Sequence, residues 1–171
     1  IFADAASLNG VLNGGAGLDA LDLSAYLSAR NIILTGLGSV DGFTGSAGAI
    51  SSGFDNINSA VGSSIGGDTL TGINAAANWT LSAGQYISTN SFTFSGFENL
   101  AGGSAADTFD LAGTHSFNLN GAGGDDRFVF SDTSSLTGNI IGGTGSGDTL
   151  DFGAVTGAIV VNFASGTASH L

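Results

Sequence analysis

The chain has 171 residues, contains no Cys, Met, Pro or Lys, and carries a net charge of −12 from 13 Asp, one Glu and two Arg. This anionic balance disfavours nucleic acid and anionic lipid as partners and attracts divalent cations. The lack of Cys excludes disulfides, and the longest apolar runs are far too short to cross a bilayer, so we expect no membrane insertion.

Residues 14–22 (GGAGLDALD) match the nonapeptide GGxGxDxUx, in which U is a large apolar residue, at every specified position. This pattern is the calcium-binding turn of a parallel β-roll. Its glycines allow positive φ, Asp19 supplies a hard anionic oxygen, and Leu21 begins a short strand. Residues 20–30 would suit either a short helix or a strand followed by a bend, and their place after the nonapeptide favours the strand.

Four weaker copies of the nonapeptide follow, at residues 66–70, 102–110, 121–129 and 142–150. The aspartates of the five turns are Asp19, Asp68, Asp107, Asp126 and Asp148. With coils of about 20 residues, the gaps between successive aspartates predict two coils, two coils, one coil and one coil.

Stacked coils would place Asp107, Asp126 and Asp148 in one row, where like charges repel unless a cation lies among them. Calcium suits such a row because it accepts six to eight oxygens in irregular geometry. We therefore predict calcium ligands among the five turn aspartates. The alternative is that these aspartates cap the turns by accepting backbone N–H groups without a metal.

Apolar residues alternate in short runs, which argues against disorder despite the many Gly, Ser, Asn and Thr. The pairs two residues apart share one face of a strand: Leu21/Leu23, Phe92/Phe94, Phe109/Leu111, Phe117/Leu119, Phe128/Phe130, Leu150/Phe152 and Val161/Phe163. Such strands also suit a β-sandwich, but repetition at about 20 residues favours a parallel β-solenoid. In that all-β fold, Phe109, Phe128 and Leu150 would stack in adjacent coils.

A longer repeat lies over the short one. Residues 2–17 align without gaps on residues 130–145 and are identical at 8 of 16 positions. We therefore expect one solenoid module at 1–128 and the start of the next at 129–171, continuous and without a linker. This period is typical of a slice of a tandem array, with flanking repeats as partners.

The turn at residues 14–22, the strand openings LDLS and LDFG, and the phrases GFDN, GFEN and VNFASGTA resemble the repeat regions of large secreted bacterial RTX-type proteins and β-solenoid adhesins. The resemblance covers nearly the whole chain, and the first nonapeptide is its most specific part. It implies an extracellular location at the bacterial surface, calcium between turns, and a role as adhesin stalk, spacer or filament that can self-associate.

Residues suited to catalysis are scarce, so we do not expect an enzyme. The chain lacks the HExxH motif and a Cys nucleophile, and His115 is expected at a corner of the fold. Glu98 and Asp55, in the matching phrases GFEN and GFDN, are expected to make corner hydrogen bonds. A carbohydrate-binding or carbohydrate-processing solenoid is the alternative function, in which Trp79, Tyr26 and Tyr86 are the candidates for stacking on cell-surface glycans. We expect Trp79 in the core.

Overall fold

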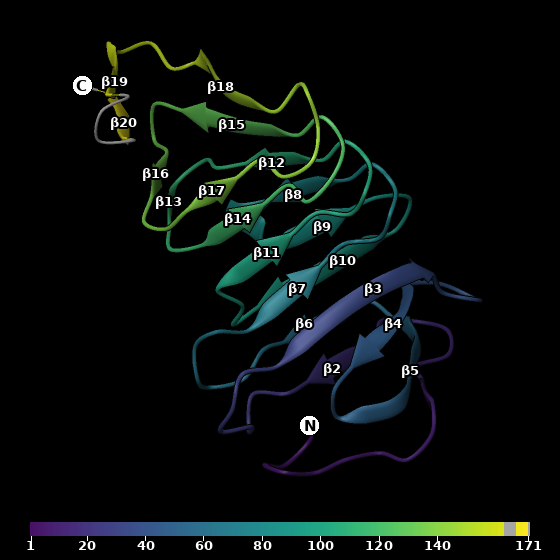
Figure 1. Ribbon diagram of the computed structural model, residues 1–171. Helices are drawn as coiled ribbons and strands as arrows, with labels where there is room; N and C mark the ends of the chain where they lie inside the picture. Colours follow the sequence, from purple (N-terminus) through teal and green to yellow (C-terminus); the bar gives the residue numbers. More distant parts are fainter. Residues whose placement is uncertain (163–166, 171) are drawn as a thin grey trace.

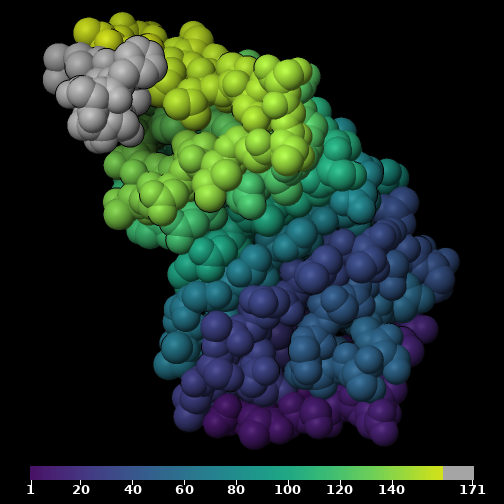
Figure 2. All heavy atoms as spheres, viewed as in Figure 1, coloured from purple at the N-terminus to yellow at the C-terminus, as the bar shows by residue number. Residues whose placement is uncertain are grey.

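The computed structural model describes residues 1–162 and 167–170, and their regular structure is almost entirely β-strand. Two sheets of eight strands lie face to face, and the chain passes between them as it advances from one end of the molecule to the other (Figure 1). The space-filling view shows the same progression, because the sequence colours run from purple at one end to yellow at the opposite end (Figure 2). The prediction of an all-β fold is confirmed.

Both sheets begin at the N-terminal end of the molecule. From that end, the first sheet contains β1 (Leu12–Asn13), β5 (Ile50–Ile57), β4 (Phe43–Ala47), β3 (Asn31–Leu37), β7 (Thr69–Thr71), β11 (Asn99–Ala101), β14 (Asn118–Asn120) and β17 (Ile140–Ile141). The second contains β2 (Ala20–Asp22), β6 (Ser59–Val61), β10 (Ser91–Ser95), β9 (Gln85–Ile87), β8 (Asn78–Thr80), β12 (Thr108–Asp110), β15 (Arg127–Ser131) and β18 (Thr149–Ala154). The remaining elements are the pairs β13 (Thr114–His115) with β16 (Ser135–Leu136) and β19 (Ile159–Asn162) with β20 (Thr167–His170), and the 3₁₀-helix η1 (Leu81–Ala83).

From β11 onward the chain alternates between the two large sheets, and the strands of successive passages pair in parallel, β11 with β7 and β12 with β8 included. In the first sheet Leu70, Leu100, Leu119 and Ile140 are in register. In the second sheet Trp79, Phe109, Phe128 and Leu150 are in register. The predicted stack of Phe109, Phe128 and Leu150 is confirmed, and its members follow one another at the expected coil length of about 20 residues.

Two segments run against this parallel order, so the expectation of purely parallel pairing is wrong there. In the first sheet, β3 pairs antiparallel with β4 and β4 pairs antiparallel with β5. In the second sheet, β9 pairs antiparallel with both β8 and β10. The connections explain the reversal, since only residues 48–49 separate β4 from β5 and only residues 81–84 separate β8 from β9. A parallel crossover needs about a dozen residues, so the chain must turn back.

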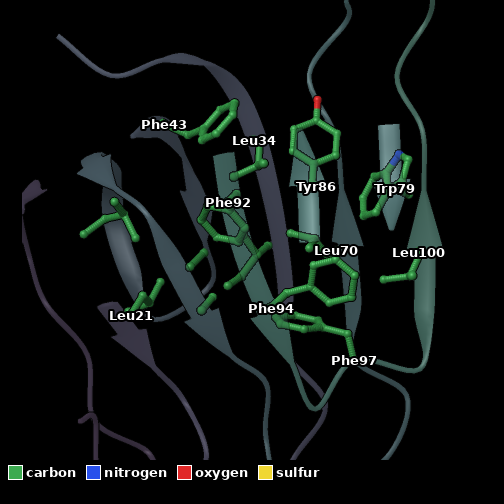
Figure 3. Close-up of a cluster of buried hydrophobic side chains, with 14 of the residues drawn as sticks. Leu21, Leu34, Phe43, Leu70, Trp79, Tyr86, Phe92, Phe94, Phe97 and Leu100 are labelled. Carbon is green, nitrogen blue, oxygen red and sulfur yellow. The ribbon is translucent and has the colours of Figure 1, made fainter. Parts of the chain in front are cut away.

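Large apolar side chains fill the space between the sheets (Figure 3). Trp79 is fully buried, as predicted, and its ring centroid lies 4.6 Å from that of Tyr86 and 5.4 Å from that of Phe109. The Phe109 and Phe128 rings are stacked with centroids 5.0 Å apart. Like side chains therefore contact like side chains along the stack. The predicted pair Val161/Phe163 lies outside the residues whose side chains are described.

The segment after the first nonapeptide forms a strand and a bend, as expected. β2 ends at Asp22, and Leu23 and Tyr26 are buried behind it. The Arg30 guanidinium carbon lies 3.7 Å from the centroid of the Tyr26 ring. The Tyr26 hydroxyl donates to the carbonyl of Ala6. The corner between β2 and β3 is thus fixed by side-chain contacts rather than by a helix.

Candidate functional site

The five turn aspartates lie at two different corners. Asp19, Asp107, Asp126 and Asp148 each come directly before a strand of the second sheet. Asp68 instead comes directly before β7 of the first sheet. The chain enters the two sheets from opposite corners, so Asp68 does not belong to the row of the other four. The predicted two-coil spacings on either side of Asp68 are therefore wrong, because the strand it precedes belongs to the other sheet.

Three of the second-sheet aspartates form a continuous column, which we call the acid column: Asp107, Asp126 and Asp148. The backbone N–H of Asp107 donates to Asp126 Oδ1 at 2.8 Å, and the N–H of Asp126 donates to Asp148 Oδ1 at 3.0 Å. The carboxylates of Asp126 and Asp148 therefore each cap the equivalent aspartate of the preceding layer. At the N-terminal end an amide takes this role, since the N–H of Asp19 donates to Asn58 Oδ1 at 3.0 Å.

The opposite corner uses the same arrangement. The backbone N–H of Arg30 donates to Asp68 Oδ1, and the N–H of Asp68 donates to Glu98 Oε2 at 3.0 Å. Ser63 holds the other side of the Asp68 carboxylate, with its N–H 2.7 Å from Oδ2. The corner role expected for Glu98 is confirmed. Asp55, its sequence counterpart, makes a different corner contact by accepting the N–H and hydroxyl of Ser39.

The first glycine of each turn in the acid column leaves room for the carboxylate. A Cβ built on Gly102, Gly121 or Gly142 would overlap Oδ2 of Asp107, Asp126 or Asp148, respectively. None of these three glycines has a positive φ. The second glycine has the positive φ expected of the nonapeptide at Gly15 (88°) and Gly143 (109°), whereas Gly103 does not. The two glycines of the motif thus have separate physical roles.

Asp107 and Asp126 carry the acid column into a buried corner, whereas Asp148 at its end is exposed. Asp107 is 2% exposed, and burial raises its pKa to about 6. The N–H of Gly103, 2.9 Å from Oδ2, opposes this rise, whereas the charge of Asp126 adds to it. Burial also raises the pKa of Asp126, and the charges of Asp148 and Asp125 contribute. Among the described residues, Asp107 Oδ1 and Asp126 Oδ2 are buried without a hydrogen-bond partner.

The acid column fits turn capping better than a complete metal site built from side chains. Within residues 1–162 and 167–170, no group of three His, Cys, Asp or Glu side chains converges on one point. Each carboxylate of the column already accepts at least one backbone N–H. A cation at the unpartnered oxygens would therefore need backbone carbonyls or water for the rest of its shell. Calcium binding at Asp19, Asp68, Asp107, Asp126 and Asp148 stays a prediction.

His115 and Arg127, two of the few basic side chains of the sequence, make structural contacts. His115 Nε2 lies 2.8 Å from the carbonyl oxygen of Ala112, and its ring stacks on Phe117 at 5.6 Å. Arg127 forms an ion pair with Asp151. His115 thus lies in the two-residue strand β13, where it pairs with Leu136 of β16.

Asn56 is a structural residue that the sequence reasoning missed. It is fully buried with φ 59°, a conformation that Asn tolerates better than most residues. Its Oδ1 accepts the N–H of Val40 at 2.8 Å, and its Nδ2 donates to Asn13 Oδ1 at 2.8 Å. The phrase GFDN, in which Asn56 follows Asp55, contained the signal.

No family model matches the chain, and no curated protein or solved structure matches it either. Across residues 1–162 and 167–170, no helix has both the length and the apolar character needed to span a membrane.

Proposed function

We propose that this chain is a segment of a parallel β-solenoid and serves as a rigid spacer in the stalk or filament of a large secreted bacterial surface protein. The observation that carries this proposal is the column of Trp79, Phe109, Phe128 and Leu150, which runs in register through successive passages of the chain. Such columns make the fold extensible, because every layer presents the surface that the next layer needs. The RTX-like turn at residues 14–22 supports the extracellular setting.

The positions of the polar and aromatic residues support a structural role over carbohydrate binding. Trp79, Tyr26 and Tyr86 are at most 1% exposed, so they lie in the core rather than on a sugar-stacking surface. The buried turn acids are engaged by backbone N–H groups of their own or the neighbouring layer. These contacts hold layers together.

Calcium is part of the proposal as a stabilising ion. Its support is the raised pKa of Asp107 and Asp126, caused by burial, together with their unpartnered oxygens. A divalent cation in the acid column would offset the repulsion between neighbouring carboxylates.

A rigid spacer must hold its two ends at a fixed distance. Single-molecule energy transfer between two dyes measures this end-to-end distance directly. Because the chain has no Cys, dyes can be attached through Leu18→Cys and Ser146→Cys, both at exposed positions near opposite ends. We expect one narrow distance distribution below the unfolding transition. A broad distribution under native conditions would contradict a rigid spacer.

A glycan-array measurement on the unlabelled chain separates the two functions. The spacer proposal predicts no saturable binding to immobilised glycans. Saturable binding to one class of glycan would replace it with the carbohydrate-binding function.

A further inference from the structure

The first and last layers of the molecule are built alike. β1 and β17 occupy equivalent places in the long sequence repeat, and so do Gly10 and Gly138, whose φ values are 145° and 144°. One inserted residue later, β2 and β18 are equivalent, and each begins directly after a turn aspartate. Farther along, β19 follows β18 as β3 follows β2, and both β19 and β3 pair antiparallel with the next strand. The sequence repeat is therefore also a repeat of structure.

Equivalent residues in these two layers differ in what covers them. Leu21 is 1% exposed because β2 pairs with β6, which places Ala60 beside it. Its equivalent Leu150 is 49% exposed. The exposed surface includes a depression lined by Phe128, Ile140, Gly142, Asp148, Thr149 and Leu150. We call this surface, formed by β17, β18 and the turn between them, the open end.

Backbone groups at the open end also lack the partners that their equivalents have. In the first layer the N–H of Gly14 donates to the carbonyl of Asp55 at 3.0 Å, and the N–H of Asp19 donates to Asn58 Oδ1. Among the described residues, the N–H of Asp148 meets no such acceptor. In the first layer these acceptors, the Asp55 carbonyl and Asn58 Oδ1, belong to the β5–β6 region of the first module.

Both sheets advance by the same amount over the repeat. The first sheet takes seven steps from β1 to β17, and the second takes seven steps from β2 to β18. At about 4.8 Å for each step, one module rises about 34 Å along the axis. The two sheets therefore advance equally along the axis despite their antiparallel segments. As a result, β17 and β18 have the same relative position as β1 and β2, and a new module can start from them.

We infer that the open end binds a second copy of this sequence, whose β5 pairs with β17 and whose β6 pairs with β18. In this junction Ala60 of the second copy covers Leu150, and its Asn58 accepts the N–H of Asp148. The second copy contributes from its Ser24 onward, because β17 and β18 already occupy the places of its β1 and β2. The inference rests on the proposed spacer function and specifies how successive repeats join.

The test is a fusion in which residues 1–152 are followed directly by residues 24–171, so that Phe152 takes the place of Leu23. In the control fusion, two whole chains are joined by a flexible Gly/Ser linker, and each copy keeps its own β1 and β2. Leu150→Asp is introduced into the first copy of each fusion and into the single chain. Leu21→Asp in the single chain measures the effect of a covered leucine.

We expect Leu150→Asp to lower the melting temperature of the direct fusion by about 5 °C or more, as Leu21→Asp does in the single chain. In the linked control and in the single chain the same change should cause a much smaller shift. Equal effects in both fusions would overturn the inference, as would a direct fusion that fails to fold while the control folds. Neither result would affect the spacer proposal, because the energy-transfer and glycan measurements use the single chain.

Discussion

At the residue scale, the first glycine of each turn in the acid column is explained by the carboxylate beside it. A Cβ on Gly121 would overlap Asp126 Oδ2 and the carbonyl oxygen of Gly142 in the next layer. The sequence motif predicted glycine here for backbone conformation, whereas the requirement is space. This distinction needs the neighbouring layer, which a single turn of sequence does not contain.

Gly121→Ala should therefore destabilise the protein by about 2 kcal/mol or more, because either the carboxylate or the backbone must move. Gly48→Ala is the matched control, since its Cβ would meet nothing within 4 Å and its φ is not positive. Chemical denaturation of both variants measures the two free energies of unfolding. Equal values would show that the turn has room for a side chain.

The pKa of Asp107 makes stability depend on pH. Its pKa of about 6 in the folded protein lies above the ordinary value of 3.8, so the folded state holds a proton that the unfolded state releases between these values. Stability should therefore fall as pH rises from about 4 to about 6, by about 3 kcal/mol in total from this group.

Carboxyls with a lowered pKa determine where stability falls at low pH. Hydrogen bonds from Ser24 and Ser39 lower the pKa of Asp22 and Asp55, so their contribution is lost as pH falls below about 4. Melting temperatures measured from pH 3 to pH 8 should therefore peak near pH 4. Asp107→Asn should flatten the fall above pH 4, and an unchanged profile in that variant would contradict the assignment to Asp107.

At the element scale, the alternating apolar pairs predicted short strands, and the coil length predicted the register of Phe109, Phe128 and Leu150. The segments β3–β4–β5 and β8–β9–β10 were not predicted, because strands that fold back have the same apolar alternation as strands that continue around the stack. The same limit explains Asp68. A turn motif indicates that a strand follows, but it does not indicate which sheet that strand joins.

The proposal that calcium binds the acid column can be tested by its effect on stability. If calcium binds there, millimolar calcium chloride should raise the free energy of unfolding, by about 2.7 kcal/mol when its concentration is 100 times the dissociation constant. Magnesium should help less because it demands octahedral geometry and keeps its waters. The measurement is thermal unfolding with each salt and with sodium chloride at matched ionic strength. If the sodium and calcium curves coincide, Asp107, Asp126 and Asp148 are metal-free turn caps.

At the scale of the whole molecule, the sequence repeat and the structural repeat have the same period. The alignment of residues 2–17 on residues 130–145 predicted that a second module starts near residue 129, and β17 and β18 occupy the places of β1 and β2. The alignment could not predict that the two sheets advance equally, because their advance depends on pairing between strands distant in sequence. The sequence pattern thus predicted the all-β class, whereas the order of the layers required the structure.

The central claim is that successive passages of the chain stack in parallel and in register, and a disulfide measures this most directly. Asp110 and Val129 are register partners on adjacent strands, so Asp110→Cys with Val129→Cys places two Cα atoms about 4.8 Å apart. Asp110→Cys with Arg127→Cys is two residues out of register, at about 8 Å, beyond the reach of an unstrained disulfide. The chain has no other Cys, so free thiols can be counted after mild oxidation. The account predicts that the first variant loses both thiols and the second keeps them; rapid cross-linking of the second variant but not the first would contradict it.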